Sequence, residues 1–163
     1  MPAGIDSGEA LAVYAYDRDH VLVGGSVGRE PAIWTDNQLQ VLQRSYPMLH
    51  DDYERPFGSV NAIVRADGHV YAAGAEYYNE ENQVATVWCD GVPTHLNGTG
   101  ENFIESEVVD IQAYGKDVYV LTAEYSTVSN GEYSYPALAS VLWMNGNEVG
   151  RIWYKGMVSF AVY

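Results

Sequence analysis

The sequence predicts an all-β protein in which three four-stranded antiparallel units are followed by one extra C-terminal strand. Two observations lead to this prediction. Short runs rich in Val, Ile, Tyr and Trp alternate with turns that contain Gly, Asn or Asp. The same order of strands and turns also recurs three times along the 163 residues. The helical and Leu-spaced patterns of ankyrin and leucine-rich repeats are absent from these units.

The repeat is clearest at the second strand of each unit. The run HVYAA from His69 matches HVLVG from His20 and DVYVL from Asp117, at spacings of 49 and 48 residues. Each unit continues with a run of small residues that ends in a tryptophan and a turn, at Trp34, Trp88 and Trp143. A period near 48 with four strands per unit is typical of β-propeller blades. The predicted fold is therefore β-propeller-like, and each blade must stack on a neighbour to bury its faces.

The repeat divides the chain into one domain of three blades. Blade 1 spans about residues 11–42, blade 2 about 60–96 and blade 3 about 108–153, and residues 157–163 match the first strand of a further blade. Three blades and one strand do not close a ring of the usual four to eight blades. The chain is then a fragment of a longer propeller, an open stack, or a protein that self-associates. We favour self-association, because two chains would supply six blades, a common ring size.

The units resemble the propeller repeats of bacterial secreted proteins and lipoproteins, which carry a V-Y-x-x-G strand followed by A-t-x-W-x-[ND]-G. Blade 2 shows both parts, from Val70 to Gly74 and from Ala85 to Gly91. In blade 1 Asn37 replaces the turn glycine. The resemblance covers roughly residues 11–163, specifies a blade but no activity, and implies export to the periplasm or cell surface. Residues 1–10 have no apolar core, so the leader is expected to be missing from this chain.

Charge excludes several classes of partner. The chain has 22 acidic and 8 basic residues, a net charge of −14, which repels phosphate backbones and anionic membranes. No nucleic-acid partner and no membrane span are predicted. The acidic surface could serve a cationic partner, but solubility is the simpler interpretation. The single cysteine, Cys89, excludes an internal disulfide and is interpreted as a packed or face-positioned thiol, not a nucleophile.

All long connections are predicted at one end of the blades, because successive connections of antiparallel strands alternate between the two ends. These are residues 43–59, 77–83, 97–107 and 126–136. Loops on a rigid scaffold often carry function, and tyrosine rings suit contacts with sugars or proteins. The candidate ligand-binding residues on this face are Glu76, Tyr77, Tyr78, Glu124, Tyr125, Tyr133, Tyr135 and Tyr53. Because Glu-Tyr repeats at equivalent positions, a structural role for the glutamate, accepting hydrogen bonds at the strand end, is the favoured interpretation.

Catalytic and metal sites have weaker support. Glu76 and Glu124, on adjacent blades, could form the carboxylate pair of a glycosidase, but an arginine cluster and the sialidase motif S-x-D-x-G-x-x-W are absent. The four histidines show no metal spacing, and His20 and His69 share a repeat position that favours a turn role. A calcium loop at Asp17 and Asp19, or at 79–82, would be incomplete. No catalytic residue, metal or cofactor is predicted.

The predicted function is a non-catalytic binding or assembly module for a carbohydrate or protein ligand, completed by self-association. The alternatives are a glycan-active propeller enzyme and a fragment of a larger propeller protein.

Overall fold

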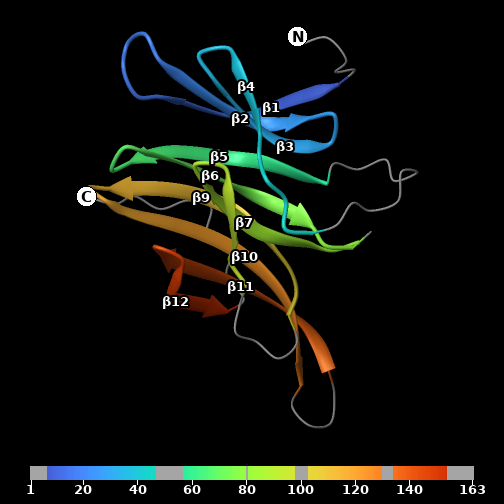
Figure 1. The fold of residues 1–163 in the computed structure, drawn as a ribbon. Coiled ribbons are helices and arrows are strands. Elements are labelled where there is room, and N and C mark those ends of the chain that lie inside the picture. The colour runs from blue at the N-terminus through green and yellow to red at the C-terminus, as the bar shows by residue number, and fades with distance from the viewer. Residues whose placement is uncertain (1–6, 47–56, 80, 98–102, 130–133, 154–163) are drawn as a thin grey trace.

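The computed structural model describes residues 7–46, 57–79, 81–97, 103–129 and 134–153, which form three four-stranded antiparallel sheets (Figure 1). Strand order follows the sequence within each sheet. Sheet 1 contains β1 (Gly8–Ala15), β2 (Val21–Val27), β3 (Glu30–Thr35) and β4 (Gln38–Val41). Sheet 2 contains β5 (Gly58–Ala66), β6 (His69–Tyr77), β7 (Gln83–Cys89) and β8 (Val92–His95). Sheet 3 contains β9 (Phe103–Tyr114), β10 (Asp117–Ser129), β11 (Ser134–Met144) and β12 (Asn147–Trp153).

The prediction of an all-β chain with three four-stranded units is therefore confirmed. The extra strand predicted at residues 157–163 lies outside the described residues. None of the described segments forms a helix with the length and apolar character that crossing a bilayer demands.

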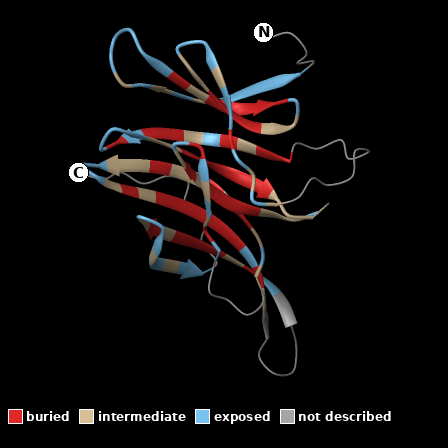
Figure 2. Ribbon diagram, viewed as in Figure 1, coloured by how far each residue is buried: buried red, intermediate tan, exposed pale blue. Residues whose placement is uncertain are grey.

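The sheets stack face to face through the first strand of each following sheet. Strand β5 contacts β1, β2 and β3 of sheet 1, and β9 contacts β5, β6 and β7 of sheet 2. Buried residues accordingly concentrate on the strands of the middle of the stack (Figure 2). One hydrophobic cluster fills the space between sheets 1 and 2 and another fills the space between sheets 2 and 3.

A row of four paired residues, one on each strand, recurs in all three sheets and explains this packing. Each row contains the repeat tryptophan on the third strand. The rows are Val13, Val23, Trp34, Leu39 in sheet 1, Ile63, Ala72, Trp88, Pro93 in sheet 2, and Ile111, Val120, Trp143, Glu148 in sheet 3. We call the face that carries this row the leading face of a sheet. Trp88 packs with Leu22 and Ile33 of sheet 1, and Trp143 packs with Val64 of sheet 2, so a leading face lies against the preceding sheet.

The turn between the third and fourth strands is fixed in the same way in every sheet. Its first residue is Asp36, Asp90 or Asn145, with φ of 48°, 50° and 50°. Aspartate and asparagine tolerate this left-handed conformation better than other non-glycine residues. Their side chains also accept hydrogen bonds from the backbone N–H groups of Val21, Val70 and Val118, at 3.1, 2.9 and 2.9 Å. The turn is thereby tied to the start of the second strand, which keeps three of the four strands in register.

The first strand of each sheet contains a β-bulge at an equivalent place. The extra residue is Leu11 in β1, Asn61 in β5 and Val109 in β9. Beside the bulge of β5 the backbones of two strands approach so closely that only glycine fits: a Cβ atom added at Gly74 would lie 1.8 Å from the carbonyl oxygen of Ser59. Gly25 has the same approach to the carbonyl oxygen of Glu9, also 1.8 Å.

Replacing Gly74 with alanine should therefore be costly for a steric reason. We expect Gly74→Ala to lower the free energy of unfolding by about 3 kcal/mol, because the obstructing atoms are backbone and cannot rotate away. Gly150→Ala is the matched control, since a Cβ atom there meets nothing within 4 Å, and its effect should stay within about 0.5 kcal/mol. Urea unfolding of both variants measures the difference. Equal effects of the two substitutions would contradict the close approach at the bulge.

Candidate functional site

The first residue of the predicted ligand face, Glu76, is buried and held by two hydrogen bonds. It lies near the end of β6 with a relative exposure of 1%. Its carboxylate accepts from the imidazole Nε2 of His95 at 2.7 Å and from the backbone N–H of Ser45 at 2.9 Å. A buried carboxylate needs such partners, because leaving it without them would cost several kcal/mol (about 1–3 for each lost bond, more for a charge). Glu76 is thus satisfied within the protein.

Glu124, the equivalent residue of β10, is also buried, with an exposure of 1%. Its Oε2 atom accepts from Nη1 of Arg151 at 2.7 Å, and its Oε1 atom is buried without a hydrogen-bond partner among the described residues. Burial raises the pKa of Glu124, and the hydrogen bond from Arg151 opposes that rise. Arg151 also donates to Glu148 and lies 5.4 Å from the ring centre of Trp153.

The partners of the two glutamates, His95 and Arg151, hold equivalent positions on the fourth strands. His95 is paired with Thr86 in sheet 2, and Arg151 is paired with Val141 in sheet 3. In sheet 1 the corresponding positions of the acid and the cation are Val27 and Val41. In sheets 2 and 3 this position pair holds a buried glutamate bonded to a histidine or an arginine, and in sheet 1 it holds Val27, which is 7% exposed, and Val41, which is 50% exposed. This pattern supports the structural interpretation of the repeated glutamate: a side chain of the fourth strand bonds each carboxylate, and for Glu76 the expected backbone donor is present as well.

Tyr78 belongs to an aromatic cluster that lies beside the Glu76 pair. The ring of Tyr46 stacks on the imidazole of His95, with centres 4.7 Å apart and planes 4° apart, and contacts the ring of Tyr78 at 5.8 Å. The Tyr78 hydroxyl donates to the backbone carbonyl of Ile104. Tyr46 and His95 were not among the predicted site residues. Their contact depends on the connection after β4 folding back over sheet 2, for which the sequence carried no signal.

The other predicted site residues are not brought together. Tyr77 is half-buried at the end of β6, and Tyr125 is 39% exposed on β10. Among the described residues no ring contact joins Tyr125 to Tyr77 or Tyr78. Tyr53 and Tyr133 lie outside the described residues, as does the side chain of Tyr135 in β11. A shared ligand surface for these tyrosines stays a prediction.

Two cavities have linings that contain none of the described candidate residues. One, of about 850 Å³, lies on the leading face of sheet 1 and is lined by residues that include Val21, Val23, Val27 and Trp34. The other, of about 500 Å³, lies between sheets 2 and 3 at the end where the short turns are, and its lining includes Asp67, Tyr71, Cys89, Lys116 and Asp117. Neither cavity is lined by Tyr77, Tyr78 or Tyr125.

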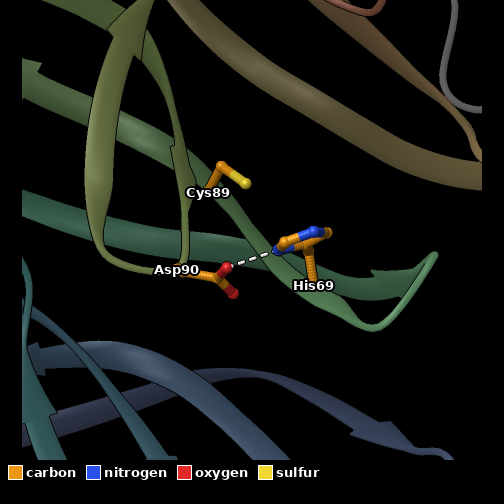
Figure 3. A group of neighbouring side chains, drawn as sticks. All are labelled: His69, Cys89 and Asp90. Atoms are coloured by element: carbon orange, nitrogen blue, oxygen red, sulfur yellow. Dashed lines mark hydrogen bonds and ion pairs between the residues drawn. The ribbon is translucent and has the colours of Figure 1, made fainter.

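Three side chains of metal-ligand type, His69, Cys89 and Asp90, lie close together in sheet 2 (Figure 3). Of the three, Cys89 also lines the second cavity. His69 begins β6, Cys89 ends β7, and Asp90 is the first residue of the following turn. The imidazole Nδ1 lies 2.5 Å from Oδ2 of Asp90, and the nitrogen, sulfur and carboxylate oxygen lie within 4.8 Å of one another. Sequence spacing alone did not predict this group. The repeat register was the available signal, since it places the start of the second strand beside the turn after the third.

Hydrogen bonding and burial shift the pKa values in this group. The hydrogen bond to Asp90 raises the pKa of His69, and the same bond lowers the pKa of Asp90. Burial and then a hydrogen bond to Cys89 raise the pKa of Tyr71. The turn role predicted for His20 and His69 is confirmed: His69 bonds the turn aspartate, and His20 bonds Asp17 at 2.8 Å.

Comparison with known proteins gives no relative for this site. No protein-family model, no curated protein and no solved structure matches the chain. The resemblance to secreted propeller repeats accordingly stays a prediction from the sequence.

Whether valines can replace the Glu124–Arg151 ion pair can be tested in sheet 3. Glu124→Val should lower the free energy of unfolding by about 3 kcal/mol, because it leaves Arg151 without its buried partner. The double variant with Arg151→Val, which copies Val27 and Val41, should recover at least about 1 kcal/mol of that loss. Urea unfolding of both single variants and the double variant completes the cycle. Additive losses would show that the two residues are not coupled.

Proposed function

We propose that this protein is a non-catalytic assembly module that completes a propeller-like ring with a second copy of itself. In this proposal the tyrosine- and acid-rich loop end offers a surface for a carbohydrate or protein ligand. The observation that supports assembly is the solvent exposure of the tryptophan row in sheet 1.

The first three residues of the row are buried in sheets 2 and 3, whereas the row of sheet 1 is only partly covered. Ile63, Ala72 and Trp88 are 7%, 1% and 0% exposed, and the equivalent residues of sheet 3 are 5%, 4% and 5% exposed. In sheet 1, Val13 is 73% exposed and Trp34 is only half-buried at the wall of the larger cavity. Exposed apolar surface of this kind commonly marks an interaction site.

The expected occupant is another sheet of the same repeat, for which a second copy is the direct source. Each buried row in the chain is covered by the opposite face of the preceding sheet, as Leu22 and Ile33 cover Trp88. Sheet 3 carries half-buried Tyr119 and Leu142 on the corresponding face. Two copies joined in this way would contribute six sheets in all, within the usual range for propellers.

Burial of the acids favours a non-catalytic function. A glycosidase needs two carboxylates that reach the substrate, about 5 to 10 Å apart. Glu76 and Glu124 are each about 1% exposed, and each is hydrogen-bonded to a side chain of the fourth strand, His95 or Arg151. The ligand-binding part of the proposal rests on exposed Tyr125 and on the predicted loops.

Light scattering on a size-exclusion column, over a dilution series, tests the assembly. We expect a dimer that Val13→Glu converts to a monomer, because the new carboxylate would be buried without a partner at the junction. Val92→Glu is the matched control: Val92 is 55% exposed on β8 of the middle sheet, so its replacement should leave the dimer intact. A parent chain that stays monomeric at every concentration would overturn the proposal and favour the fragment alternative.

The salt dependence of dimerisation is a second, independent test of the same assembly. Each copy carries a net charge of −14, so association brings like charges together. Added salt screens this repulsion, and the dissociation constant of the dimer should therefore fall between about 0.05 and 0.5 M salt. A dissociation constant that rises with salt would indicate a junction made by opposite charges and would contradict an apolar row as its basis.

A further inference from the structure

The turn beside sheet 2 combines a structural pair with a thiol that the other sheets lack. His69 and Asp90 belong to a turn arrangement that recurs as His20 with Asp36, at 3.9 Å, and as Asp117 with Asn145, at 2.8 Å. The repeat therefore accounts for the histidine and the aspartate. It does not account for Cys89, whose equivalents in the strand register are Thr35 and Met144.

The ligand set and its spacing suit one kind of ion. Imidazole, thiolate and carboxylate together are a zinc-type set, with ligand distances of about 2.0–2.3 Å, whereas calcium and magnesium take oxygen ligands. Three donor atoms within 4.8 Å of one another can reach a single ion at such distances after small side-chain rotations. The exposed fractions of the His69 and Asp90 side chains, 52% and 53%, leave space for those rotations. Oδ1 of Asp90 can keep its hydrogen bond from Val70 while Oδ2 turns from His69 to the ion.

The surroundings leave room for a further ligand on the ion. Cys89 also lines the 500 Å³ cavity between sheets 2 and 3, together with Asp67, Asp117 and Lys116. The two carboxylates attract a cation and outnumber the one ammonium group, and the chain as a whole has a net charge of −14. Three protein ligands next to a cavity match zinc sites that keep their fourth position for water or another small ligand.

We propose that His69 Nδ1, Cys89 Sγ and a carboxylate oxygen of Asp90 form a binding site for one zinc-class transition-metal ion per chain. The ion would join the start of β6 to the end of β7 and would leave a coordination position toward the cavity. This site is independent of the junction proposed on sheet 1, because Val13 and Trp34 lie on another sheet.

Cobalt(II) titration of the reduced protein tests the site, since a thiolate ligand gives cobalt a charge-transfer band in the near ultraviolet. We expect that band with one ion per chain, and loss of the band on adding Zn²⁺. Cys89→Thr copies the residue of sheet 1 and should abolish the band. His69→Gln should weaken cobalt binding by about 100-fold or more, as expected for a direct ligand.

His20→Gln is the matched control. It removes the equivalent histidine of sheet 1, where Thr35 replaces the thiol, and should leave cobalt affinity unchanged. Circular dichroism checks that every variant keeps its strands, and Val13→Glu should bind cobalt as the parent does. Absence of the charge-transfer band in the parent would overturn the proposal. So would equal losses in His20→Gln and His69→Gln, which would indicate an unspecific effect of charge.

Discussion

The structure depends on one packing constraint: each four-stranded sheet has two apolar faces, and a row of residues centred on a tryptophan must be covered by the preceding sheet. Trp88 and Trp143 meet this constraint inside the chain, and their indole N–H groups donate to the carbonyl of Gln43 and the hydroxyl of Thr122. Trp34 holds the equivalent position in sheet 1, at the end of the stack, where no described sheet covers it. The partly covered row of sheet 1 follows from the repeat itself, since the first unit has no preceding sheet within the described chain.

Within this scaffold the repeat tolerates different chemistry at equivalent positions. One position pair holds Glu76 and His95 in sheet 2, Glu124 and Arg151 in sheet 3, and two valines in sheet 1. Replacing a buried ion pair such as Glu124–Arg151 with apolar residues of similar volume is often nearly neutral in stability, because the desolvation of two charges offsets most of their attraction. The exchange explains why a conspicuous acidic repeat in the sequence need not mark a site for ligands.

The turns show the opposite case, in which a structural turn also carries side chains of types that can bind a metal. A residue in the left-handed conformation ties the third turn to the second strand in every sheet. In sheet 2 the neighbouring residue is a cysteine and the facing residue a histidine, so the turn gathers three metal-ligand types. In sheet 3, Asp117 and Asn145 complete the same turn by an amide–carboxylate hydrogen bond.

The sequence by itself determined the three units, their four strands and their short turns, because alternating apolar residues and Asp-Gly and Asn-Gly turns act locally. The same local pattern recurs with a period near 48, which marks the units. It also determined that Glu76 and Glu124 are equivalent. Only the tertiary structure decided that these glutamates are buried against His95 and Arg151, that Tyr46 covers one pair, and that Cys89 meets His69. Those contacts join residues 19 to 49 positions apart through strand register and loop paths, which no local pattern specifies.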